Sequence, residues 1–417
     1  VYCGTLAALR TGDCYSRPIQ PHSWSATRML IGSETLEIAG AAADAVGADG
    51  YAASAAVALS HVMSLYSLSM DASHKGLKAG EVETKAILDL FDRHKLVAQP
   101  LFLATRYLLA KQYEGMDLGD AMIELGNGSG DTAHSILGDR KLCLGSTPII
   151  DENMGARANF GSHRHYMAID ASQIPFFFYN FSSSTLIYTF YHLEFPARTC
   201  GEVFRVLQPG GTFAFNFLKR DDVAATRVLP QMLSGLGMSD HARRADSFVF
   251  VDYGADSETP DLAQAIRLIE EAGFVDVKVR PYLSRSLSAL IWWVRDFEIV
   301  LGLSAITGVA NPSIAERYRT FCKDVLAPLL ANDDDLAARE GGTFAFVTAR
   351  KPGAPVAALD DEAVLQRRRC PKTGRPLIDP GGWLDGGGTA YPVLRGIPLM
   401  MPVYADIWSA QFPGLPP

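Results

Sequence analysis

The sequence predicts an α/β protein with a seven-stranded, mostly parallel sheet that carries helices on both faces. Two observations indicate this class. Between residues 120 and 350, short apolar segments alternate with segments of helical period, and a glycine-rich turn follows the first apolar segment. We also expect a helical N-terminal cap and a small β-rich C-terminal module. The chain has 417 residues and so exceeds the roughly 250 to 300 at which one core stops growing.

Seven segments have the length and apolar content of buried strands. Pro209 and Gly210 predict a tight turn just before the fifth of them. The segments are residues 121–125, 141–145, 165–169, 185–190, 212–217, 274–279 and 343–349.

Helical patterns separate these strands. Before the sixth strand, Thr259 is predicted to cap a helix that begins with Pro260 and ends at Gly273. Residues 281–340 form an insertion whose first helix has an apolar stripe, which is typical of a core or dimer contact and less so of a substrate wall. The helix before the fifth strand has one apolar face, formed by Cys200, Val203, Phe204 and Leu207.

Domain boundaries follow from these patterns. Residues 1–115 are expected to form an irregular arm and a helical cap, with helices over 36–69 and 81–115 and a break at Pro100. Residues 116–355 form the core, and residues 356–417 form a small ribbon-like tail. The first residue is valine, which leaves the natural N-terminus open.

Composition narrows the range of partners. The net charge of −8 argues against a protein that binds by neutralising phosphates, so no nucleic acid partner is expected. The most apolar long run, from Ser288, contains Arg295, Asp296 and Glu298 and therefore does not predict a membrane span. The six cysteines are scattered without a CxxC pair, which favours a reducing, cytoplasmic setting.

The stretch AMIELGNGSGDTAH, residues 121–134, ends a strand at Glu124 and then places glycines at 126, 128 and 130. A strand-to-helix turn of this kind directs backbone amides and the positive end of a helix dipole at a polar ligand. The dinucleotide fingerprint needs a glycine where Asp131 stands, and the glycines follow GxGxG spacing instead.

That spacing, with an acid two residues before the first glycine, resembles the nucleoside-binding turn of class I S-adenosylmethionine-dependent methyltransferases. Three further segments resemble the same family in order and spacing over residues 120–350: HYMAIDASQIPF, TLIYTFYHLEFPARTCGEVFRVLQPGGTFAF and EEAGFVDVKV. The resemblance implies a Rossmann-like fold and S-adenosyl-L-methionine as cofactor. It also implies methyl transfer to a small metabolite, and the aromatic and aliphatic content of the cap and insertion predicts a largely apolar one.

The resemblance also assigns roles to residues. Gly126 and Gly128 would admit the backbone to the ribose and methionine portions, and Gly130 would permit close helix packing. Glu124 would hold the amino-acid end or orient the turn, and Asp170 would accept a hydrogen bond from adenine, with Ile174, Pro175 and Phe176 near the base. The full predicted cofactor set is Glu124, Gly126, Asn127, Gly128, Gly130, Ser146, Asp170, Ala171 and Phe190.

One position departs from the family. An acid usually follows the second strand and grips both ribose hydroxyls, and here Ser146 stands there. A hydroxyl cannot match the bidentate grip of a carboxylate. Either Asp151 or Glu152 substitutes, or cofactor affinity is low, or the ligand differs. The departure keeps open non-methylating chemistry with a sulfonium cofactor on the same scaffold.

Methyl transfer from a sulfonium is an in-line displacement, to which alignment can contribute roughly 7 to 11 kcal/mol without an acid or base. Tyr191 and His192 follow the fourth strand and are the predicted catalytic residues. His192 would accept a proton, or alternatively bond to backbone at a helix entrance. Tyr191 would face the sulfonium or simply pack. His163 and His165 have no partner nearby in sequence, so no metal site is expected.

The tail from Cys370 to Pro402 resembles a small zinc-ribbon family of methyltransferase activators or partners, most clearly in AYPVLRGIPLMM. Thr373 stands where that family has its second cysteine, and no later cysteine follows. We therefore expect a metal-free module that docks on the core or mediates dimer contacts. The degenerate tail also leaves open a non-catalytic binding subunit. Packing is expected from Trp383, Tyr391, Leu394 and Ile397.

Overall fold

The computed structural model describes residues 84–85, 88–89, 100–137, 142–219, 260–300, 319, 322–357 and 359–411. The predicted arm and the helix over 36–69 lie outside these residues, as does Thr259. The chain divides into two compact units. One consists of residues 1–108, 220–257 and 282–343, and the other of residues 109–219, 258–281 and 344–417.

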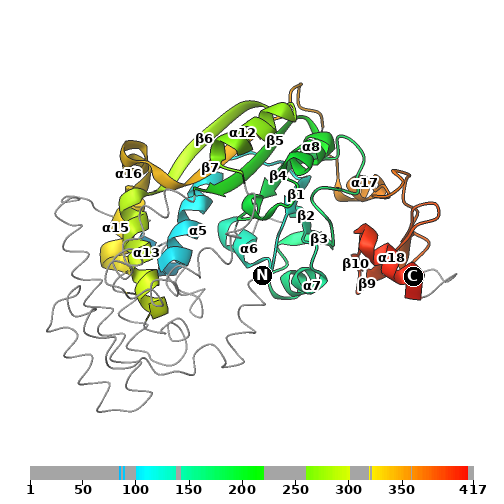
Figure 1. The fold of residues 1–417 in the computed structure, drawn as a ribbon, viewed down its shortest axis with the longest axis horizontal. Coiled ribbons are helices and arrows are strands. Elements are labelled where there is room, and N and C mark those ends of the chain that lie inside the picture. Colours follow the sequence, from blue (N-terminus) through cyan, green and yellow to red (C-terminus); the bar gives the residue numbers. More distant parts are fainter. Residues whose placement is uncertain are drawn as a thin grey trace, which may run out of the picture. The chain divides into compact units, whose positions relative to one another are not determined.

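A seven-stranded sheet in the order β3-β2-β1-β4-β5-β7-β6 organises the described part of the chain (Figure 1). Strands β1 to β5 pair in parallel, and β7 is antiparallel to β5. The predicted α/β class and mostly parallel sheet are therefore confirmed. The strands are β1 (Met122–Leu125), β2 (Leu142–Ser146), β3 (His163–Met167), β4 (Phe181–Leu186), β5 (Leu207–Leu218), β6 (Val275–Ser284) and β7 (Gly342–Arg350).

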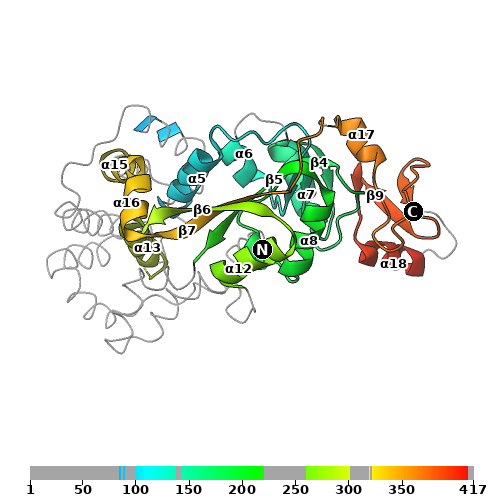
Figure 2. The same ribbon diagram turned by 90° about the horizontal axis from the view of Figure 1, so that it is seen from above.

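Helices cover both faces of this sheet, with α6 on one side and α8 and α12 on the other (Figure 2). Thr199, Cys200 and Val203 form part of the buried face of α8. The cap of α12 is Asp261, whose side chain accepts from the amide of Gln264 in a reciprocal capping box. The helices are α5 (Pro100–Tyr113), α6 (Asp131–Leu137), α7 (Ile150–Asn159), α8 (Pro196–Val206) and α12 (Leu262–Glu271).

The predicted bounds of several strands were wrong, and the fourth, fifth and sixth differ most: the sixth runs from Val275 to Ser284 rather than over 274–279. The fourth strand begins at Phe181 and ends at Leu186 rather than running over 185–190. Its serines resemble a loop in sequence, but Ser183 and Ser184 are fully buried, and the hydroxyl of Ser183 donates to the carbonyl of Leu118. The fifth strand begins at residue 207, because the predicted turn is a bulge within it.

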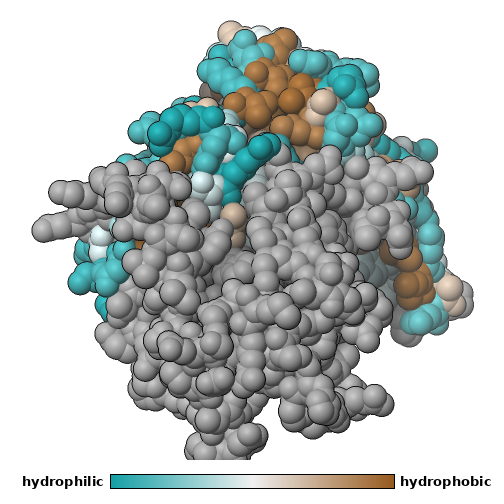
Figure 3. Space-filling view, turned by 60° about the vertical axis from the view of Figure 1, so that its left-hand side comes forward, coloured by the Kyte–Doolittle hydropathy of each residue, from teal (hydrophilic) through white to brown (hydrophobic). Residues whose placement is uncertain are grey.

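The core lies between the sheet and its helices. Phe190 stacks on Phe215, with ring centroids 4.4 Å apart, and Phe176 meets Phe181 edge to face. On the surface, hydrophobic residues gather near the top of the face drawn in Figure 3. Edge strand β6 exposes Val275 by 44% and Val279 by 39%.

In the other unit, the described residues include α13 (Arg285–Val300), the π-helical turn η4 (Cys322–Leu326), α15 (Ala327–Ala331) and α16 (Asp333–Glu340). The carboxylate of Asp333 is fully buried and accepts 2.8 Å hydrogen bonds from the amides of Leu283 and Ser284. Leu283 has a φ of +54°, which an L side chain rarely adopts. Asp333 therefore fastens α16 to the start of α13.

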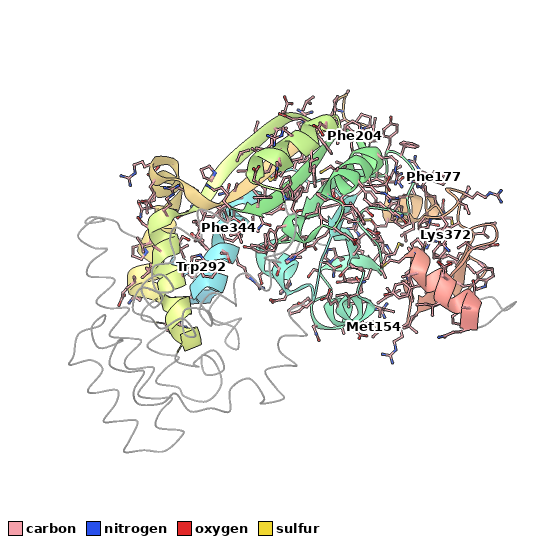
Figure 4. All side chains as sticks on the ribbon, viewed as in Figure 1. Met154, Phe177, Phe204, Trp292, Phe344 and Lys372 are labelled. Atoms are coloured by element: carbon pink, nitrogen blue, oxygen red, sulfur yellow. The ribbon has the colours of Figure 1, made fainter. Side chains whose placement is uncertain are left out.

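The tail consists of α17 (Asp361–Gln366), the three-stranded sheet of β8 (Trp383–Asp385), β9 (Ala390–Leu394) and β10 (Ile397–Pro398), and α18 (Pro402–Gln411). It docks on the core. The amide of Ala168, just after β3, donates to the carbonyl of Pro398 at 2.9 Å, and the amide of Met400 donates back to Ala168 at 2.8 Å. Met154 of α7, labelled in Figure 4, packs against the shared cluster that includes Ile397.

Of the four residues predicted to pack the tail, Tyr391 and Ile397 are fully buried, whereas Leu394 is 46% exposed and that expectation was wrong. Leu394 ends β9 next to Arg395, whose φ of +50° marks the turn into β10. No described helix has the length and hydrophobicity that a membrane span requires.

Candidate functional site

The glycine turn joins β1 to α6 at the carboxyl edge of the parallel strands. The amides of Gly126 and Asn127 both donate to the carbonyl of Ser146, at 2.6 and 2.9 Å, and so tie the end of β1 to the end of β2. Gly126, Gly128 and Gly130 have φ values of +83°, +49° and +78°. Because side chains strain a backbone in this region, the conformation of the turn depends on these glycines.

The three glycines face different neighbours. A Cβ on Gly126 would lie 2.4 Å from the hydroxyl of Thr189, and one on Gly130 would lie 2.8 Å from the Cβ of Ala156. Among the described residues, a Cβ on Gly128 would meet nothing within 4 Å. Two of the glycines therefore serve packing within the protein, as predicted for Gly130, while Gly128 presents its backbone to open space.

Asn127 lies at the centre of the turn and is 4% exposed. Its side-chain amide donates to the carbonyl of Gly128 at 2.9 Å, while its Oδ1 is buried and has no hydrogen-bond partner in the described part of the chain. A buried acceptor of this kind is costly unless a donor reaches it. The turn therefore combines an open backbone with an unsatisfied acceptor.

The second strand ends in a different arrangement from the one expected. Ser146 is 1% exposed, and its hydroxyl donates to the carbonyl of Glu124 at 3.1 Å, so the hydroxyl proton is used in a hydrogen bond within the sheet. Residues 150–159 form α7 rather than a loop that folds back. In the first turn of α7, Asp151 is exposed, whereas the half-buried Glu152 accepts from the Thr147 hydroxyl at 2.8 Å. Glu152 is thus the acid held next to the end of β2.

Asp170 follows β3 and lies at the same carboxyl edge, since β1, β2 and β3 are parallel neighbours. Its Oδ1 accepts from the amide of Ser172 at 2.8 Å, and its carbonyl accepts from the amide of Gln173 at 2.9 Å, which folds the segment into a turn. Ala171, within this turn, is half-buried. Ile174 is 1% exposed and part of the core.

Glu124 does not extend into open space. Its Oε2 lies 2.7 Å from Nε2 of His163, and the two side chains are 1% and 0% exposed. Gly145 of β2 lies between them: a Cβ there would come within 2.8 Å of the imidazole ring. Tyr166 closes the cluster edge to face with His163. Of the two roles considered for Glu124, this placement favours orienting the turn.

After β4, residues Phe190–His192 form the 3-10 turn η2. Phe190 is 1% exposed and stacks in the core, which places it away from an open site. Tyr191 is 4% exposed and meets the ring of His192 edge to face, with centroids 4.6 Å apart. His192 is exposed, and its amide donates to the carbonyl of Thr189 at 2.8 Å.

Sequence reasoning missed several residues of this region. The Thr189 hydroxyl donates to the carbonyl of Gly126 at 3.2 Å, and the fully buried Asn216 accepts from the amide of Tyr188 at 2.7 Å. Tyr188 has a φ of +53°, so this bond holds a strained backbone beside the turn. The role of His163 could not be found either, because its acid comes from another strand.

Comparisons with known proteins find a family match within the core. Residues 123–215 match the model of a family described as a methyltransferase domain. No curated protein matches the chain.

Two similar solved structures are an S-adenosylmethionine-dependent methyltransferase from Thermotoga maritima and phosphoethanolamine N-methyltransferase 2 from Haemonchus contortus. The first is 14% identical, with a TM-score of 0.37, and covers 64% of this chain and 99% of its own. The second, in complex with S-adenosyl-L-methionine, is 15% identical, with a TM-score of 0.38, and covers 65% of this chain and 57% of its own.

Proposed function

We propose that this chain, which carries a class I S-adenosylmethionine-dependent methyltransferase domain with S-adenosyl-L-methionine as its cofactor, methylates a small, largely apolar metabolite. The observation that supports a ligand at the glycine turn is the contrast between its glycines. Gly126 and Gly130 are enclosed by protein, whereas Gly128 faces open space next to the unsatisfied Oδ1 of Asn127. No packing reason within the described residues accounts for that open side.

The donors and acceptors of the turn fit an adenosyl amino acid. Oδ1 of Asn127 would accept from the amino group, and the backbone around Gly128 would lie against the ribose and methionine portions. Glu124 would orient the turn without touching the ligand, because His163 holds it within the sheet and fixes the end of β1. Asp170 would accept from adenine, and its turn keeps the carboxylate in place.

We assign the ribose to Glu152. A carboxylate can accept from both hydroxyls, and the Thr147 hydroxyl already holds this one next to the end of β2. Ser146 cannot donate to the ribose without releasing the carbonyl of Glu124. The sequence pattern points to Ser146 at this position, and the geometry favours Glu152.

The bound sulfonium supplies an activated methyl group, and the protein needs chiefly to align an acceptor with it. Tyr191 is almost buried at the end of β4 and would fix the position of the acceptor. His192 is exposed beside it and would take the proton that a hydroxyl or amine loses on methylation.

Transfer of a labelled methyl group from S-adenosylmethionine to a panel of apolar hydroxyl, amine and carbon acceptors tests this function. We expect label in at least one acceptor, with His192→Gln lowering the rate by about 10²- to 10⁴-fold for an oxygen or nitrogen acceptor. Cofactor binding without labelled product would instead favour non-methylating chemistry. Failure to bind the cofactor would indicate a non-catalytic subunit and contradict the proposal.

Glu152→Gln and Ser146→Ala separate the two ribose assignments. Glu152→Gln should weaken cofactor binding about tenfold or more, because an amide cannot accept from both hydroxyls. Ser146→Ala should have a smaller effect on binding. Titration calorimetry with S-adenosylmethionine measures both, and the reverse order of effects would return the role to Ser146.

A further inference from the structure

A cavity of about 330 Å³ lies between the first turns of α8, the segment after Asp170 and the start of the tail. Arg198 and Glu202 of α8 line it from one side, and Arg369 and Pro371 from the tail. Ser172, Gln173 and Ile174 form the remaining wall. The volume is in the range of a small-molecule site.

The acid in this cavity is already saturated. Arg205 donates to both oxygens of Glu202, from Nε at 2.6 Å and from a terminal nitrogen at 2.7 Å. The amide of Ile174 adds a third bond at 2.8 Å. Arg205 also donates to the carbonyls of residues 174 and 176, so it is a structural brace. The carboxylate of Glu202 is therefore already engaged by Arg205 and by a backbone amide.

The arginines that face the cavity lack such partners. The nearest nitrogen of Arg369 is 3.5 Å from Glu202, which is beyond a good hydrogen bond, and its Nε is buried and has no hydrogen-bond partner among the residues that the structure describes. Within the described residues, no carboxylate pairs with Arg198 on the opposite wall. Burial and, next, the positive charge of Arg205 lower the pKa of Arg369. An anion would relieve that repulsion.

We propose that this cavity is a binding site for a small oxyanion, namely a phosphate or carboxylate group of a metabolite, held between Arg369 and Arg198. The two terminal nitrogens of a guanidinium can bind two oxygens of such a group at once. Apolar Pro371 would face the rest of the molecule. The site is separate from the glycine turn and does not depend on the proposed methyl transfer.

Titration calorimetry of the full chain with inorganic phosphate, and separately with acetate, at constant ionic strength tests the site. We expect one phosphate per chain, and Arg369→Gln or Arg198→Gln should weaken its binding at least tenfold. Arg280→Gln removes the same charge from the exposed part of β6 and should bind phosphate as the natural chain does. Thermal melting curves confirm that each variant is folded.

The glycine turn could itself attract an anion, so Gly128→Val provides a second control. This variant should bind phosphate unchanged even where it no longer binds the cofactor. Binding of phosphate or acetate that needs Arg369 supports the site. The proposal would be overturned if neither phosphate nor acetate bound to the natural chain. It would also be overturned if Gly128→Val lost the binding, or if the two arginine variants bound as well as Arg280→Gln.

Discussion

Nε2 of His163 on β3 lies 2.7 Å from Oε2 of Glu124 on β1, across a strand position that is glycine. Both side chains are almost fully excluded from solvent, and Glu124 is two residues before the first glycine of the candidate cofactor turn. The pair thus links the turn to the far side of β2. Its energetics can be tested directly.

His163→Leu should destabilise the protein by about 3 to 5 kcal/mol, because Glu124 would remain buried without its partner. The double variant with Glu124→Leu should recover much of this loss, since it buries no unpaired charge. Urea unfolding measures both. Additive losses in the double variant would show that the two groups do not interact.

Gly145→Ala tests the same contact from the strand between. The new Cβ would come within 2.8 Å of the His163 ring, and we expect a loss of about 1 to 3 kcal/mol. In the His163→Ala background, the loss should become smaller because the ring is gone. An equal loss in both backgrounds would mean that Gly145 is needed for another reason.

The glycines of the turn should separate folding from binding. Gly130→Ala combines a φ of +78° with a Cβ 2.8 Å from Ala156 and should cost about 2 to 4 kcal/mol of stability. Gly128→Ala should cost only about 1 to 2 kcal/mol, yet weaken cofactor binding more than its stability loss indicates. Chemical unfolding and calorimetry in parallel check this. Similar losses of stability in Gly130→Ala and Gly128→Ala would contradict the contrast between the enclosed Gly130 and the open Gly128.

Lys351 is expected to be a structural residue. Lys351 is 6% exposed, and its ammonium group donates to the carbonyls of Phe204 and Leu207 at the end of α8, at 2.5 and 2.8 Å. Lys351→Met should destabilise the protein by about 1 to 3 kcal/mol, because two buried acceptors lose their donor. Lys278→Met, on the exposed part of β6, serves as the control. Equal unfolding midpoints for the two variants would contradict this role.

Asp333 should make stability depend on pH. Burial raises the pKa of its carboxyl to about 6 from the ordinary 3.8, despite the amides that favour the charged form. The folded state therefore binds this proton more tightly than the unfolded state does. The contribution of Asp333 to the free energy of unfolding falls as pH rises from about 4 through 6.

As pH rises from 4 to 7, the free energy of unfolding of Asp333→Asn should increase relative to that of the natural chain by up to about 3 kcal/mol. Unfolding curves at both pH values measure this change. Asp335→Asn, an exposed neighbour, should show no such change. A difference between Asp333→Asn and the natural chain that is the same at both pH values would contradict the prediction.

The sequence predicted the sheet and the glycine turn because these depend on local patterns: apolar runs, helical spacing and glycines that permit positive φ. It missed the start of β4, because the hydroxyl of the buried Ser183 donates to the carbonyl of Leu118, which is distant in sequence. Phe190, which the sequence pattern assigns to the cofactor, stacks on Phe215 in the core, and its contact with a cofactor stays a prediction. Contacts such as His163 with Glu124 require knowledge of which strands are neighbours.

The central claim is that the backbone at residues 126–130 and the carboxylate of Asp170 hold the same adenosyl ligand. Titration calorimetry of the natural chain and of Asp170→Ala with S-adenosylmethionine tests it most directly. We expect one ligand per chain, with affinity at least tenfold weaker in the variant. No binding by the natural chain, or equal affinity for both proteins, would contradict the account.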